Sequence, residues 1–157
     1  NGPNLAQGVT LPRPPDLPDL EVELRKADVR SFVEAVAAMR RSTQQALEAH
    51  LERLLETPLP SGRVLAWLDG RPVACGQWML HDGLAGVYDV ITAEDARGRG
   101  LATLVTAHLL ARAWEHGASF AHLQVDESNA PALAVYRKFG FATLYTYHYR
   151  APPGECE

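Results

Sequence analysis

The spacing of hydrophobic and polar positions changes several times along the chain, and each change predicts a different element. Residues 20–25 alternate between apolar and polar side chains, which predicts a first strand. Two helices are then predicted by apolar residues at helical spacing: Phe32, Val36 and Met39, followed by Leu47, Leu51, Leu54 and Leu55. From residue 64 to residue 92 the turn sequences at 69–70 and 81–83 separate three apolar stretches, so an antiparallel meander of three strands is expected.

The second half of the chain alternates between helix and strand patterns. Broad apolar periodicity predicts a long helix over about residues 100–116, and a short strand is expected at 120–125. A helix should begin at Ser128-Asn129 and end near Gly140, before final strand material at 141–150. This order predicts an α/β fold with a mixed, mostly antiparallel central sheet and helices on both faces.

The ends of the chain differ in composition from its middle. Residues 1–19 hold five prolines, which predicts an extended arm or linker before a domain at 20–150 and a short tail at 151–157. The first residue is Asn1 and not Met, so we expect a trimmed chain or a piece of a longer protein. A monomer, a homodimer and docking on a missing N-terminal domain all stay open as modes of association.

Composition excludes several classes of function. A hydrophobic content of 46% in 157 residues suits one domain with its own core. A net charge of −4 argues against broad binding to nucleic acid or to an anionic membrane, and no apolar run reaches the roughly 20 residues of a spanning helix. The two cysteines, Cys75 and Cys156, lie far apart and fit a reducing cytoplasm, and the histidines show no metal-ligand spacing.

The stretch from Asp89 to Thr103 carries the first candidate site, a strand followed by an Arg/Gly loop and a helix start. Such a loop presents unpaired backbone N–H groups and the positive end of a helix dipole. Gly98 and Gly100 allow close backbone approach, and two arginines add positive charge, so the loop can bind a phosphate-bearing anion. It lacks the P-loop pattern and the third glycine of a dinucleotide motif, and a tight strand-to-helix turn stays open as an alternative.

A second candidate site lies at residues 124–141. Asn129 stands at a helix start, where it is either a helix cap or a ligand contact. Tyr136 follows two helical turns later, and it is either a core aromatic residue or a phenol that donates a proton at a cavity wall.

Together the two stretches resemble the GCN5-related N-acetyltransferases, over about residues 20–150. One motif reads R-x-x-G-x-[GA] and the other N-x-x-A-x-x-x-Y-x-x-x-G-F. The first is filled by Arg97, Gly100 and Ala102, and the second by Asn129, Ala132, Tyr136, Gly140 and Phe141.

The resemblance implies acetyl-CoA as cosubstrate and gives each matched residue an expected role. The main chain of Val90, Ile91 and Thr92 would pair with the pantetheine arm. Asn129 would contact the pantetheine or pyrophosphate region, and Tyr136 would protonate the departing thiolate. The pyrophosphate would bind the loop residues Arg97, Gly98, Arg99, Gly100, Leu101, Ala102 and Thr103.

One position departs from the pattern of some members. Gln124 stands where those members carry a glutamate base, and an amide cannot accept a proton, so Asp89 is the substitute base that we expect, acting directly or through a water. A plain strand carboxylate is the other interpretation of Asp89. The implied activity is cytoplasmic transfer of acetyl from acetyl-CoA to a primary amine of a small molecule or peptide, by direct attack in a ternary complex without a metal. A non-catalytic acyl-CoA-binding module, such as the C-terminal half of a tandem protein of this family, is the alternative.

Overall fold

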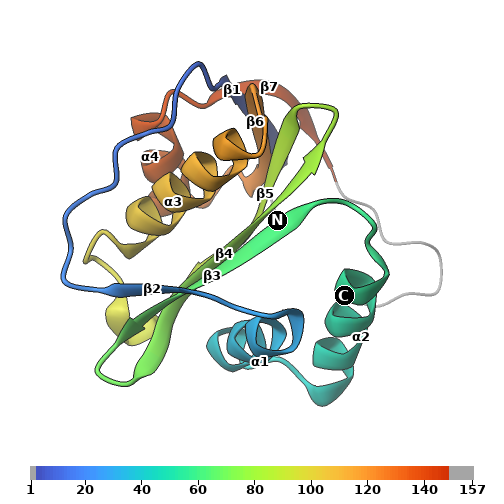
Figure 1. Ribbon diagram of the computed structural model, residues 1–157, viewed down its shortest axis with the longest axis vertical. Coiled ribbons are helices and arrows are strands. Elements are labelled where there is room, and N and C mark those ends of the chain that lie inside the picture. Colours follow the sequence, from blue (N-terminus) through green and yellow to red (C-terminus); the bar gives the residue numbers. More distant parts are fainter. Residues whose placement is uncertain (1–2, 149–157) are drawn as a thin grey trace.

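The computed structural model describes residues 3–148, which form one mixed sheet between two pairs of helices (Figure 1). The strands lie in the order β2-β3-β4-β5-β6-β1-β7, and every neighbouring pair is antiparallel except β5 and β6. The elements are β1 (Asn4–Thr10), β2 (Glu23–Lys26), α1 (Val29–Arg40), α2 (Gln44–Glu56), β3 (Ser61–Leu68), β4 (Arg71–His81), β5 (Leu84–Thr92), a 3-10 turn (Glu94–Ala96), α3 (Leu101–Glu115), β6 (Phe120–Asp126), α4 (Ala130–Lys138) and β7 (Ala142–Tyr147).

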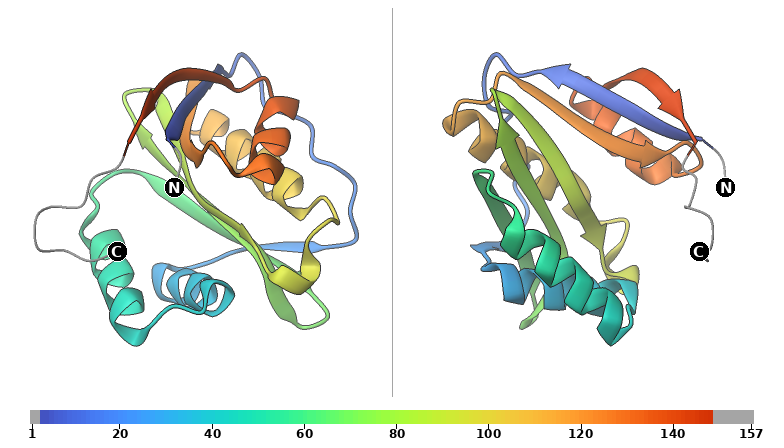
Figure 2. Two further views of the ribbon diagram at one scale, coloured as in Figure 1. Left: turned by 180° about the vertical axis from the view of Figure 1, so that it is seen from behind. Right: turned by 90° about the vertical axis from the view of Figure 1, so that its right-hand side faces the viewer.

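The helices cover both faces of the sheet, as the sequence predicted (Figure 2). On one face Phe32 of α1 is fully buried against Leu65 and Cys75 of the strands, with α2 beside it. On the other face α3 places Val105 and Leu109 in the larger core cluster. Asp28 and Thr43 begin α1 and α2 by accepting hydrogen bonds from the backbone N–H groups of Ser31 and Ala46, which are ordinary helix caps.

The N-terminal segment differs from the expected arm, because residues 4–10 form strand β1 inside the sheet. β1 pairs with β6 from Asn4–Asp126 to Thr10–Phe120, and its other edge pairs with β7. Four of the five prolines follow this strand, in a connection over residues 11–22 that has no helix or strand. The high proline count therefore reflects this connection, and the prediction of an extended arm was wrong for residues 4–10, which form a strand. The expected tail at 151–157 and the end of the last predicted strand lie outside the described residues.

Strand β5 carries an irregularity at the centre of the molecule. Cys75 pairs with Ile91 and Gln77 pairs with Tyr88, so two residues of β5, Asp89 and Val90, lie opposite Gly76 of β4. Asp89 has a φ of 55°, in the left-handed region that favours glycine. A bulge of this kind bends the strand and redirects a side chain, here the carboxylate of Asp89.

Strands β5 and β6 are paired for only part of their length. Their parallel pairing covers Leu84–Phe120, Ala85–Ala121 and Gly86–His122, and within the described residues it goes no further. Both strands continue, β5 to Thr92 and β6 to Asp126. Beyond Gly86 the edge of β5 that faces β6 therefore keeps backbone groups without a strand partner, and this part of β5 includes Val90, Ile91 and Thr92, which the resemblance expects to pair with the pantetheine arm.

The position of β1 can be tested with two matched leucine substitutions. Leu5 on β1 is 8% exposed, and Leu17 in the following connection is 44% exposed. Leu5→Ala should lower the free energy of unfolding by about 2 kcal/mol or more, because it removes buried methyl groups from a packed core. Leu17→Ala should change it by less than about 0.5 kcal/mol. Chemical denaturation measures both, and equally small effects would show that residues 4–10 are not part of the sheet.

Candidate active site

A cavity of about 540 Å³ opens where β5 and β6 separate. α1 and α2 contribute to one side of its lining, and β6 and α4 contribute to the other. The cavity brings together residues from the two separate stretches that the sequence predicted as sites, namely Asp89 and Val90 from the first and Asn129 and Tyr136 from the second.

Ile91 and Thr92 do not line this cavity. Ile91 packs against the cluster beneath α1, and its main chain lies beside Cys75 of β4. Thr92 lies opposite Ala74, and its carbonyl oxygen accepts a hydrogen bond of 3.4 Å from Nε of Arg97. Thr92 therefore links the end of β5 to the Arg/Gly loop.

The Arg/Gly loop lies outside the cavity, at the start of α3. Gly98 and Gly100 have φ angles of 79° and 78°, and Gly100 is the N-cap of α3 without a side-chain cap. The backbone N–H groups of the first turn lack helical partners, so they are available to an anion. A Cβ atom at Gly98 would meet no atom within 4 Å, so this part of the loop is open.

Other residues of the loop have clear structural positions. Leu101 is buried in the core and anchors the start of α3, whereas Arg97 and Arg99 are exposed. Ala102 and Thr103 are half-buried in the first turn. Oγ1 of Thr103 accepts a hydrogen bond of 3.4 Å from Nζ of Lys138, which adds a cation from α4 beside the loop.

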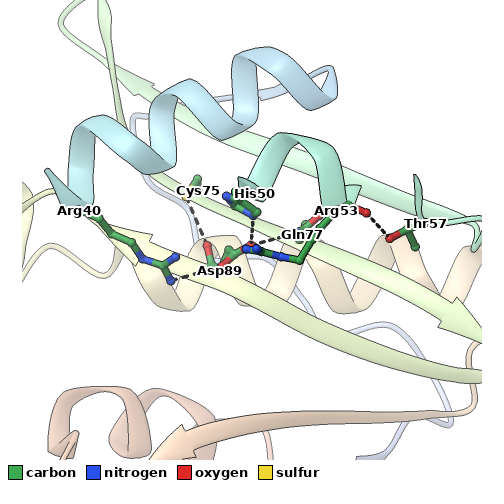
Figure 3. A network of polar contacts seen from close by, with 7 residues as sticks. All are labelled: Arg40, His50, Arg53, Thr57, Cys75, Gln77 and Asp89. Carbon is green, nitrogen blue, oxygen red and sulfur yellow. Dashed lines mark hydrogen bonds and ion pairs between the residues drawn. The ribbon is translucent and has the colours of Figure 1, made fainter. Parts of the chain in front are cut away.

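The carboxylate of Asp89 is the centre of a polar network on the helix side of the cavity (Figure 3). Its Oδ2 accepts hydrogen bonds from Nε2 of Gln77 at 2.7 Å and from Nε2 of His50 at 3.1 Å. Nη2 of Arg40 lies 3.3 Å from its Oδ1. Because an ionised carboxylate only accepts hydrogen bonds, Nε2 of His50 carries a hydrogen.

Sequence reasoning did not identify Arg40, His50 or Gln77. They come from α1, α2 and β4, and they meet only because the helices fold over the sheet. Gln77 is 1% exposed. Its position inside an apolar strand was the one sequence signal available, because a buried amide needs hydrogen-bond partners. Its Oε1 has no hydrogen-bond partner among the described residues.

Cys75 lies beneath the network and is a free thiol. Its Sγ donates a hydrogen bond of 3.3 Å to the backbone oxygen of Asp89. Burial, with the negative charge of Asp89 as a second cause, raises the pKa of Cys75 to about 12. The thiol is therefore protonated at neutral pH and is a poor nucleophile.

Tyr136 of α4 and Asn129, the N-cap residue of α4, lie on the opposite side of the cavity. Tyr136 is 8% exposed and packs edge-to-face on Phe141, with 5.7 Å between the ring centroids. Burial raises the pKa of Tyr136, so its hydroxyl stays a proton donor through the neutral range. Oδ1 of Asn129 accepts a hydrogen bond of 3.2 Å from the backbone N–H of Ala132, so this residue does cap the helix while it lines the cavity.

Metal-ligating clusters and membrane-spanning helices are the last two features to consider. Residues 3–148 contain no cluster of three or more metal-ligating side chains. In the same part of the chain, no helix is both long and apolar enough to pass through a membrane.

Comparison with known proteins identifies a matching family model and relatives of part of the chain. The model described as the acetyltransferase (GNAT) family matches residues 24–141. An uncharacterized N-acetyltransferase of Bacillus subtilis, YobR, is 36% identical over 77 residues, covering 49% of this chain and 31% of that protein. A mycothiol acetyltransferase of Thermomonospora curvata is 37% identical over 97 residues, covering 60% of this chain and 32% of that protein.

A solved structure gives the corresponding likeness in fold. The GCN5-related N-acetyltransferase from Sphaerobacter thermophilus superposes with a TM-score of 0.73 at 24% identity, covering 92% of this chain and 49% of that one. The chain thus spans about a third of the length of the two curated relatives and about half of the solved chain.

Proposed function

We propose, from the premise that the chain belongs to the acetyltransferase (GNAT) family, that it transfers an acetyl group from acetyl-CoA to a primary amine. The observation that carries this proposal is the opening between β5 and β6. Pairing stops at Gly86 and His122, while β5 continues past the cavity toward the Arg/Gly loop. Members of this family use acetyl-CoA, whose pantetheine arm and pyrophosphate suit an unpaired strand edge and an anion-binding helix start.

In this proposal the coenzyme lies along β5. The edge of Val90, Ile91 and Thr92 that has no strand partner pairs with the pantetheine arm, and Asn129 contacts the arm from the start of α4. The pyrophosphate binds the backbone N–H groups of the loop at 97–103, beside Lys138. The acetyl group is then directed into the cavity between Asp89 and Tyr136.

The proposed chemistry is direct transfer. The amine nitrogen attacks the thioester carbonyl carbon, the new N–C bond forms, and the C–S bond breaks. The departing thiolate takes the proton of the Tyr136 hydroxyl, and Asp89 takes the proton lost by the amine, directly or through a water. No covalent enzyme intermediate is needed, and the protonated thiol of Cys75 is consistent with its absence.

The acceptor is a small-molecule or peptide amine, and the reaction is placed in the cytoplasm, where a free thiol such as Cys75 stays reduced. Because several relatives are named mycothiol acetyltransferases, the amine substrate of those enzymes belongs in the first acceptor panel. Release of free CoA across that panel tests the proposal. Tight acetyl-CoA binding without release for any amine would instead indicate the non-catalytic acyl-CoA-binding module.

Tyr136→Phe tests the proton donor. The substitution keeps the ring that packs on Phe141 and removes only the hydroxyl, so acetyl-CoA affinity should be unchanged. kcat should fall by about 100-fold, the lower end of the usual contribution of a general acid, because a thiolate is already a good leaving group. Tyr145→Phe, on the exposed strand β7, is the matched control and should have wild-type kinetics. Loss of coenzyme affinity in Tyr136→Phe would make the hydroxyl a structural group.

Asp89→Asn tests the proton acceptor. The variant should lose roughly tenfold or more in kcat at neutral pH. The defect should shrink as pH rises toward the pKa of the free amine, near 10, because the amine then loses its proton to solvent. Asp95→Asn removes an exposed carboxylate that pairs with Arg71 outside the cavity, and it serves as the control. A defect that is the same at every pH would assign Asp89 a positioning role only.

Gly100→Val tests the loop, with Gly70→Val as its control. Both glycines have left-handed φ angles, 78° and 79°, so valine introduces a similar backbone strain at each. Gly70 lies in the turn between β3 and β4, outside the proposed coenzyme site. Calorimetry should show acetyl-CoA affinity lowered by about tenfold or more only in Gly100→Val, because only there is a phosphate contact blocked. Equal affinity in both variants would mean that the pyrophosphate binds elsewhere.

A further inference from the structure

Three basic side chains form the boundary between two neighbouring hollows. Arg40, His50 and Arg53 line the large cavity, and the same three residues line a smaller hollow of about 120 Å³ between α1 and α2. They therefore lie where α1 and α2 approach the part of the cavity between Asp89 and Tyr136, where the proposed reaction takes place. Nothing in the proposed transfer of an acetyl group requires positive charge at this place.

The charges on this side of the cavity do not balance. Among residues 3–148, Asp89 is the one acidic residue that lines this side, and Arg40 already compensates it at 3.3 Å. The other acidic residue of the lining, Asp126, lies at the end of β6, and its Oδ1 accepts hydrogen bonds from the backbone N–H and the hydroxyl of Ser128 at 2.8 Å and 2.6 Å. Within residues 3–148, Arg53 has no ion pair.

Arg53 also points in a direction that suits a ligand. Its side chain runs from α2 toward the network around Asp89 (Figure 3), and Arg53 lines the cavity. The backbone oxygen of Arg53 accepts a 2.8 Å hydrogen bond from the hydroxyl of Thr57. This bond holds the C-terminal end of α2 in place. Arg53 is exposed, so its guanidinium is hydrated in the free protein. A substrate that displaces this water is favoured when it brings an anion that accepts hydrogen bonds from the guanidinium.

We propose that the acceptor is an amine that also carries an anionic group of the carboxylate or phosphate type, bound by Arg53. This proposal rests on the proposed acetyltransferase function and names its class of substrate. The two hydrogen bonds and the ion pair on Asp89 leave its carboxylate at least one acceptor site for the substrate amine. The anionic group then lies beside Arg53, where the fork of N–H donors matches the oxygens of a carboxylate or phosphate. Arg53 is accordingly the residue that determines specificity, and neutral amines and polyamines are poor acceptors.

Matched pairs of amines test the proposal. Serine is compared with serinamide, and phosphoethanolamine with ethanolamine, so that each pair differs mainly in the anionic group. Binding is measured by calorimetry with the protein saturated by CoA, which prevents turnover, and release of CoA from acetyl-CoA is measured separately. The anionic member of at least one pair should bind roughly tenfold tighter than its neutral partner, as expected for charge-assisted hydrogen bonds, and the better pair distinguishes carboxylate from phosphate.

Variants of Arg53 assign the effect to this residue. Arg53→Gln should weaken binding of the anionic amine about tenfold and raise its KM without changing kcat. The affinity and the KM of the neutral amine should stay unchanged. Arg53→Lys should keep most of the preference because it keeps the charge. Arg30→Gln, on the exposed surface of α1 and outside both hollows, should behave as wild type.

The outcomes separate the two proposals. The proposal about the anionic group would be overturned if both anionic amines bound no more tightly than their neutral partners. It would also be overturned if Arg53→Gln weakened binding of the anionic and the neutral amine of a pair equally, even if neutral amines are acetylated. If the anionic members bind more tightly and yet no amine releases CoA, the acetyltransferase function fails and the anion site stands.

Discussion

The early end of the pairing between β5 and β6 is the constraint on which the site depends. Two parallel strands that stayed paired to their ends would fill the middle of the sheet and leave no room for a ligand. Here the pairs stop at Gly86 and His122, and the bulge at Asp89 bends β5 away just beyond that point. The lost hydrogen bonds leave backbone groups free, and a cavity of about 540 Å³ opens beside them.

The same bulge connects the two layers of helices to the chemistry. It directs the carboxylate of Asp89 toward α1 and α2, where Arg40 and His50 reach it, while Tyr136 of α4 faces the cavity from the opposite layer. Each layer thus contributes a different function to the proposed reaction. The α4 side supplies a proton donor whose pKa is raised by burial, and the α1–α2 side holds the carboxylate and the cations around it.

The sequence predicted those parts of the molecule that depend on local pattern. The meander, the long helix α3 and the Arg/Gly loop follow from periodicity and glycine placement, and they occur near their predicted positions. β1 was missed because a seven-residue strand beside prolines has no local signal, and its partners β6 and β7 lie at the other end of the chain. Arg40, His50 and Gln77 were missed for the same reason, since only the packing of α1 and α2 over β4 brings them to Asp89.

The place of β1 has a consequence for how the chain reaches its native state. Side chains 136 residues apart, Gln7 and Thr143, are hydrogen-bonded between β1 and β7. Contacts of such high sequence separation close large loops and slow folding. The outer edge of β1, the strand that supports β6 and with it one wall of the cavity, can be covered only after β7 has been synthesised and has met β1. Until then a nascent chain carries β1 with an open edge, which exposes this side of the sheet to misassembly during synthesis.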